Sequence, residues 1–206
     1  MGLTQVEHKD YAYILADGKI RVQCDENTPG AVRRDYETSD GKTGVKFELV
    51  YDKIDGLITF IGFKEGDFGK QLQVEIDGIN LMMNTSSNFG EDLMKKLPNI
   101  DLAKPVELSP YNFTNDKGKS VKGISVVQEE EKITNFFYDT DAASVTNGYP
   151  APEGDTKSFD SDDWKTYFIG ARKFLIKYIE ENIIAKIALD SLPLSDNEIK
   201  TEDIEM

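Results

Sequence analysis

The chain has one cysteine and one histidine among its 206 residues. Cys24 alone cannot form an internal disulfide, and its solitary presence is compatible with a reducing compartment. His8 is the only imidazole, so Ser-His-Asp and Cys-His catalytic arrangements have little to draw on. A zinc site built from cysteine and histidine ligands is excluded by the count of these residues.

Long apolar runs are also missing. No segment approaches the roughly 20 apolar residues that span a bilayer. The first ten residues, MGLTQVEHKD, lack the apolar core of a signal peptide. We therefore expect a soluble, cytoplasmic protein without a membrane partner. The sequence has no Gly-rich loop ending in Lys-Ser or Lys-Thr, so nucleotide hydrolysis loses its usual phosphate-binding motif.

Positive charge is scarce, with 24 basic against 38 acidic residues and a net charge of −14. From Asp190 onward, six acidic residues stand against Lys200 alone, a net charge of −5 that leaves −9 on the remainder. Proteins that bind phosphate backbones usually carry a basic surface. Any such surface on this chain must therefore be local, on an acidic body.

The most informative segment is Gly56 to Asp77, GLITFIGFKEGDFGKQLQVEID. Two runs of alternating apolar and polar residues flank the short connection at residues 65–67, which predicts a β-hairpin. The first run predicts one face of Leu57, Thr59, Ile61 and Phe63 and another of Ile58, Phe60, Gly62 and Lys64. The second predicts one face of Phe68, Lys70, Leu72, Val74 and Ile76, with Gln71, Gln73, Glu75 and Asp77 opposite.

The rest of the chain predicts a mainly β protein. Short strands are expected at Tyr11 to Leu15 and Lys19 to Cys24 before the hairpin, and others follow it. A short helix at Ser87 to Leu97 would lie where an OB barrel carries its helix, between the third and fourth strands. This order suits an OB-like Greek-key β-barrel. We expect that domain over residues 1–138, a linker over residues 139–160, a long C-terminal helix over residues 161–189 and a disordered acidic tail over residues 190–206.

Three segments also resemble a family of bacteriophage single-stranded DNA-binding proteins. They are the hairpin above, LPNIDLAKPVELSPYNF (residues 97–113) and GKSVKGISVVQEEEKITNFF (residues 118–137). Family members carry a Lys-Glu-turn-aromatic-Gly-Lys hairpin, an Asn-Ile-Asp segment before a Lys-Pro strand, and a Gly-initiated strand ending at Gln. The resemblance covers residues 56–137, about two-fifths of the chain.

The resemblance implies an OB-fold protein that coats exposed DNA in phage replication or recombination, in the host cytoplasm, with little sequence preference. Such binding needs cations along the phosphates and rings that stack on bases. Lys64, Phe68 and Lys70 match the family hairpin. The other candidates are Tyr111, Phe113, Lys117, Lys119 and Lys122 around the later hairpin, and Arg33, Arg34 and Tyr36 in a loop or edge segment. Core packing remains an alternative for Phe68, and simple solvation for the turn lysines.

The acidic tail resembles a second feature of single-strand binders, a disordered end whose apolar side chains dock on replication or repair proteins. The corresponding residues here are Ile199, Glu202, Asp203, Ile204, Glu205 and Met206. The last residue is Met where an aromatic residue often ends such tails, and a merely solubilising tail is the alternative. A homodimer through the long helix or the tail is a further possibility.

Two other function classes stay open. One is a non-catalytic β-barrel that serves a phage as a structural or protein-interaction module. The other is a carboxylate-dependent enzyme, since paired acids bind Mg²⁺ or act as acid and base. No spacing in the sequence singles out such a pair, so we expect no enzyme and no cofactor.

Overall fold

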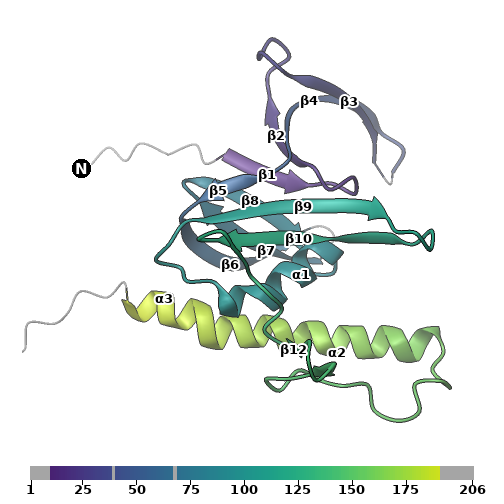
Figure 1. The fold of residues 1–206 in the computed structure, drawn as a ribbon. Coiled ribbons are helices and arrows are strands. Elements are labelled where there is room, and N and C mark those ends of the chain that lie inside the picture. Colours follow the sequence, from purple (N-terminus) through teal and green to yellow (C-terminus); the bar gives the residue numbers. More distant parts are fainter. Residues whose placement is uncertain (1–9, 39, 67–68, 191–206) are drawn as a thin grey trace, which may run out of the picture.

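The computed structural model describes residues 10–38, 40–66 and 69–190, without the side chains of residues 188–190. Its described part is mainly β, with two sheets, one small hairpin and two helical regions (Figure 1). Among these residues no helix has both the length and the hydrophobicity of a membrane span.

A seven-stranded sheet forms one layer of the molecule. In spatial order it contains β3 (Val32–Glu37), β4 (Thr43–Tyr51), β2 (Ile20–Cys24), β1 (Asp10–Ile14), β8 (Ile79–Asn84), β7 (Gly69–Ile76) and β6 (Ile58–Gly66). All neighbours are antiparallel except β1 and β8, which run parallel. The β3–β4 end projects away from the rest of the fold (Figure 1).

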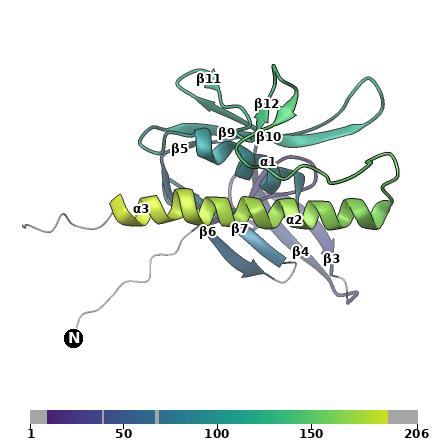
Figure 2. The ribbon, with the colours of Figure 1, turned by 90° about the horizontal axis from the view of Figure 1, so that it is seen from below.

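A second, four-stranded sheet and the helices cover one face of the first sheet. The sheet contains β11 (Glu131–Lys132), β10 (Ser120–Gln128), β9 (Val106–Thr114) and β5 (Ile54–Gly56), and the separate hairpin contains β12 (Tyr138–Asp139) and β13 (Ser144–Val145). The helical segments are α1 (Asn88–Lys96), the 3₁₀ turn η1 (Leu97–Asn99), α2 (Ser161–Ile179), the π-helical turn η2 (Glu180–Ile184) and α3 (Ala185–Asp190). In Figure 2, β9–β10 and β6–β7 lie on opposite sides of α1 and the long helix.

The two sheets are joined by one bent strand segment. Only Leu57 separates β5 from β6, so the chain passes directly from the second sheet into the first. Gly56 makes this corner with φ +148°, a value that L side chains rarely adopt, and an added Cβ would lie 2.2 Å from the Asp77 carboxylate. The Leu57 amide donates to Asp77 Oδ1 at 3.1 Å, which holds the corner against the β7–β8 turn.

Neither sheet closes into a barrel, so the expected OB-like barrel is not confirmed beyond the mainly β class. Closure of the run β8–β7–β6/β5–β9–β10 would require its two outer strands, β8 and β10, to pair. The free edge of β8 is instead occupied by β1, and that of β10 by β11. The first strand of the chain therefore prevents the closure that the later strands suggest.

The hairpin prediction holds for β7 and needs one correction in β6. Leu72, Val74 and Ile76 are fully buried on one face, as the alternation predicts. A register shift between Ile58 and Phe60 reverses the phase at the start of β6. Ile58 therefore lies in the core, 8% exposed, on the same side as Ile61, whereas the sequence placed these two residues on opposite faces.

The long C-terminal helical segment forms where the periodicity predicts it. Asp160 caps α2 in a capping box with Asp163. Ala171, Leu175 and Ile179, spaced by four residues, form a buried stripe. Leu175 and Ile179 of this stripe pack into the hydrophobic core of their own chain, so the stripe is buried without a second copy of the protein.

The segment expected as a linker contributes to the same core. Within residues 139–160, the ring of Tyr149 contacts Phe137 and Phe174 at centroid distances of 5.6 and 5.8 Å. Phe137 itself is 1% exposed and makes a T-shaped contact with Tyr178 of α2. Aromatic side chains thus join the segment to the long helix.

Replacing Leu175 by alanine should destabilise the fold by about 2–5 kcal/mol, because the fully buried side chain leaves a cavity under α2. Urea denaturation measures the change. The matched control is Ile169→Ala on the same helix, where the side chain is 41% exposed and the cost should stay within about 0.5 kcal/mol. Equal costs for both variants would contradict the packing of α2 described above.

Candidate nucleic-acid interface

The seven-stranded sheet has one face opposite the core residues Leu72, Val74 and Leu81, on which some side chains are exposed and others, such as Asn80 and Met82, are buried. Directly paired residues of neighbouring strands point to the same side, so the strand register defines this outer face. From the middle strand to the β6 edge it carries Tyr11 and Tyr13 (β1), Asn80 and Met82 (β8), Gln71, Gln73 and Glu75 (β7), and Phe60, Gly62 and Lys64 (β6). Its far strands carry Arg21 and Gln23 (β2), Lys46, Glu48 and Val50 (β4), and Val32, Arg34 and Tyr36 (β3).

Three aromatic rings are exposed on this outer face. Tyr11, Tyr13 and Phe60 are 41%, 46% and 45% exposed. The two tyrosines lie on the middle strand, and Phe60 lies on the edge strand three neighbours away, at roughly 14 Å for strands about 4.8 Å apart. Such rings offer their π faces to any flat group that approaches the sheet.

Two rings of the outer face lie flat because glycine is beneath them. A Cβ at Gly62 would meet Phe60 Cζ at 2.6 Å, and a Cβ at Gly44 would meet the Tyr36 ring at 2.6 Å. Neither glycine has the positive φ that would by itself require glycine. Glycine at these two positions therefore leaves the space that the Phe60 and Tyr36 rings occupy.

Four cations lie on the outer face against two carboxylates, although the whole chain carries −14. Lys64 and Lys46 form no ion pair with a described carboxylate, and Lys46 Nζ lies 5.2 Å from the centroid of the Tyr36 ring. They lie on β6 and β4, roughly 24 Å apart across five strand spacings. The two lysines thus lie on either side of Tyr11 and Tyr13, and Lys64 is on the same strand as Phe60.

The other two cations share one buried carboxylate. Glu48 is 5% exposed, and Arg34 donates to both of its oxygens at 2.8 and 2.5 Å. Arg21 adds a longer contact of 3.4 Å and donates to Asp17 at 2.6 Å. The hydrogen bonds from Arg34 lower the pKa of Glu48, against the opposing effect of burial. This ion-paired group fixes both guanidinium groups on the sheet.

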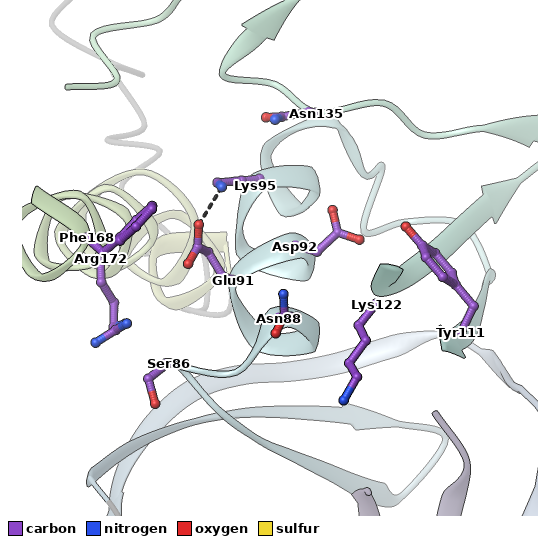
Figure 3. A pocket seen from close by; sticks show the side chains of 10 residues that line it. All are labelled: Ser86, Asn88, Glu91, Asp92, Lys95, Tyr111, Lys122, Asn135, Phe168 and Arg172. Carbon is purple, nitrogen blue, oxygen red and sulfur yellow. Dashed lines mark hydrogen bonds and ion pairs between the residues drawn. The ribbon is translucent and has the colours of Figure 1, made fainter. Parts of the chain in front are cut away.

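A polar pocket of about 490 Å³ lies between α1, β9–β10 and α2 (Figure 3). Lys122 of β10, Tyr111 of β9 and Arg172 of α2 line it, together with α1 residues. Burial and the neighbouring Asp92 carboxylate raise the pKa of Tyr111. Within the described residues, no group of three histidine, cysteine, aspartate or glutamate side chains is arranged to hold a metal ion.

The residues expected in one nucleic-acid groove fall into separate places. Lys64, Arg34 and Tyr36 lie on the outer face, whereas the register puts Lys70 and Arg33 on the opposite side of the sheet. Lys70 there approaches Glu180 of η2 at 3.7 Å. Lys122 and Tyr111 line the pocket, and Phe113 lies beside Tyr111 at 5.8 Å, while Lys117 and Lys119 occupy the β9–β10 turn. Phe68 and the tail residues Ile199, Glu202, Asp203, Ile204, Glu205 and Met206 lie outside the described residues.

Sequence reasoning missed the rings and cations at the centre of the outer face. Tyr11, Tyr13 and Arg21 were recognised only as parts of strands, and Phe60 only as part of the hairpin. The alternation of Asp10–Ile14 does place both tyrosines on one side. Their position beside β8 depends on a parallel pairing between segments about 70 residues apart, for which the sequence carries no local signal.

Comparison with protein-family models, with curated proteins and with solved structures finds no match for this chain. The candidate interface therefore depends on its own geometry and chemistry.

Replacing Glu48 by glutamine should destabilise the fold by about 1–3 kcal/mol at neutral pH, because two guanidinium groups lose their shared carboxylate. Since the pKa of Glu48 is lower in the folded protein than in the unfolded chain, its contribution is present above about pH 4.3 and is lost as the pH falls toward the lowered pKa. Melting temperatures from pH 7 to pH 3 should thus fall more steeply for the wild type than for E48Q.

The control for this comparison is Asp35→Asn, because the Asp35–Arg33 ion pair at 2.8 Å is exposed. Its melting temperature should stay close to that of the wild type across the same pH range. A Glu48 variant that melts in parallel with the wild type at every pH would contradict the role given to this carboxylate.

Proposed function

We propose that the protein binds single-stranded DNA across the outer face of the seven-stranded sheet, without catalysis and with little sequence preference. One observation supports this most: the exposed rings of Tyr11, Tyr13 and Phe60 lie on the same face as Lys46 and Lys64, whose ammonium groups form no ion pair within the described part of the chain. Stacking platforms bordered by cations are the elements that sequence-tolerant binding of single strands requires.

The dimensions and chemistry of the outer face fit an extended strand. The two lysines are separated by roughly 24 Å across the strands, and the rings lie between them. Gln71 adds an amide group that can donate or accept hydrogen bonds with any base. Because stacking uses the π face that every base has, such a surface discriminates little between sequences.

The connectivity supports an OB-like origin for this part of the fold. Counting the bent β5–β6 segment as one strand, the chain continues through β7, β8, α1, β9 and β10, with the helix between the third and fourth strands. In OB folds the face of strands 2 and 3 binds oligonucleotides. On this count the corresponding strands are β7 and β8, which lie between β1 and the edge strand β6.

A role in phage replication or recombination, with the acidic tail docking on replication or repair proteins, follows as part of this proposal.

A protein-interaction module is the second candidate, since exposed rings on a sheet also bind other proteins. A carboxylate-dependent enzyme is the third. Incubation with oligo-dT distinguishes the three candidates. A DNA-binding protein binds oligo-dT with an affinity that falls as the salt concentration rises. An interaction module does not bind it, and an enzyme degrades it in the presence of Mg²⁺.

Replacing Tyr13 or Phe60 by alanine should weaken oligo-dT binding by about 1–3 kcal/mol for each lost stack. Fluorescence anisotropy at low salt measures the affinity. The matched control is Tyr51→Ala, because Tyr51 is 46% exposed like Tyr13 but pairs with Ile20 on the opposite face. Similar losses for the Tyr51 and Tyr13 variants would rule out the outer face as the binding surface.

Replacing Lys64 by glutamine should reduce the slope of log K against log salt by about one, because one phosphate contact is lost. Lys70→Gln is the paired control, since Lys70 lies on the helix-facing side of the same hairpin. The same titrations at several salt concentrations give both slopes. A change at Lys70 without one at Lys64 would place the DNA on the other side of the sheet.

Removal of residues 191–206 should tighten oligo-dT binding, because this segment carries five acidic residues and one lysine. The gain should shrink as salt rises and screens the repulsion between the tail and the DNA. Anisotropy titrations of the full and shortened chains at low and high salt test this. Identical affinities at low salt would show that the tail has no influence on the binding surface.

A further inference from the structure

The pocket between α1, β9–β10 and α2 contains cations that form no ion pair with any described residue. Lys122 and Arg172 line it, and neither contacts a described carboxylate. Nε of Arg172 is shielded from solvent and donates no hydrogen bond to a described residue. A shielded guanidinium N–H without an acceptor is costly, so a ligand that supplies an acceptor would bind favourably there.

The acidic residues of the same pocket are already neutralised. Glu91 accepts a hydrogen bond from Lys95 at 2.5 Å. Asp92 accepts from Lys96 at 2.8 Å and from the Ile124 amide at 2.8 Å. Ion pairing with Glu91 raises the pKa of Lys95 despite the opposing effect of burial. The pocket therefore retains two uncompensated positive charges in a chain of net charge −14.

Arg172 and Lys122 lie on either side of the start of α1 in this pocket (Figure 3). In Figure 3 the Arg172 guanidinium and the Lys122 ammonium extend to the same side of the pocket, with Ser86 and Asn88 between them. Asn88 is the first residue of α1, where backbone amides lack intrahelical acceptors and the helix dipole favours negative charge. Two side-chain cations and the start of a helix thus line one pocket.

We propose that this pocket binds a phosphate group. A phosphate dianion can accept hydrogen bonds from the Arg172 guanidinium and from the Lys122 ammonium on different oxygens, which a planar carboxylate does less well. The pocket adjoins the outer face, because Asn84 belongs to that face and its Oδ1 accepts from both the amide and the hydroxyl of Ser86. The phosphate comes either from a free phosphate or mononucleotide, or from a DNA strand that leaves the sheet at this point.

The first experiment contains no DNA and is therefore independent of the proposed function. Titration of ¹⁵N-labelled full-length protein with inorganic phosphate, at constant ionic strength, should give saturable shifts of the Arg172 Nε–H and Asn88 amide signals. Sodium acetate at equal ionic strength should not. Arg172→Gln and Lys122→Gln should each weaken phosphate binding by at least about tenfold, as expected for the loss of a charged hydrogen bond.

Lys173→Gln is the matched control, because Lys173 is the exposed neighbour of Arg172 on α2. It should bind phosphate like the wild type, and all three variants should melt near the wild-type temperature without phosphate. Phosphate shifts that do not saturate, or that persist unchanged in both the Arg172 and the Lys122 variants, would overturn the proposal.

A second experiment identifies the source of the phosphate. Tighter binding of 5′-phosphorylated oligo-dT than of its 5′-hydroxyl counterpart, lost in Arg172→Gln, would indicate a terminal phosphate. Equal binding of both oligonucleotides, weakened to the same extent by Arg172→Gln, would indicate an internal phosphodiester. If neither oligonucleotide responds to Arg172→Gln while inorganic phosphate does, the ligand is a free phosphate or mononucleotide.

Discussion

The parallel pairing of β1 with β8 is the contact on which the rest of the arrangement depends. It occupies the edge of β8 that barrel closure would need, and it adds β2, β4 and β3 to the sheet. The result is an open sheet of seven strands whose outer face carries exposed aromatic rings. The same pairing sets Tyr11 beside Asn80 and Tyr13 beside Met82, so the exposed rings owe their positions to it.

Local pairing of charges explains how an acidic chain can present positive surfaces. Glu48 is bound by Arg34 and Arg21, and in the pocket Glu91 is bound by Lys95. Acids bound in this way contribute little negative potential at short range, while cations without partners keep theirs. Net charge therefore describes the solubility and long-range repulsion of this protein better than it describes either surface.

Local patterns in the sequence predicted the elements well and their assembly poorly. Alternation identified the buried face of β7, and the spacing of Leu175 and Ile179 identified the stripe of the long helix, because both signals depend on neighbours in the chain. The shift between Ile58 and Phe60 needed knowledge of the partner strand. Lys64 and Lys70 lie close together in the sequence of the hairpin and were expected to form one cluster. The pairing of the two strands nevertheless points them to opposite faces of the sheet.

The candidate site was predictable only in part for the same reason. The kinds of residue needed, rings and cations, were recognised, and Lys64, Arg34 and Tyr36 do lie on the outer face. Tyr11 and Tyr13 were not identified as part of the site. They lie beside β8 only because β1 pairs with it, and β2 to β7 separate these two strands in the sequence. Arg172 was seen only as part of a helix, and its shielded Nε becomes apparent only when α2 lies beside α1.

The glycines under Phe60 and Tyr36 imply an unusual pattern of permitted variation. Neither position 62 nor position 44 has a positive φ, so the backbone alone does not require glycine there. A Cβ at either position would lie 2.6 Å from the ring above it, so even alanine would force that ring to move. Related sequences that keep both rings in place over the sheet should therefore also keep glycine at both positions.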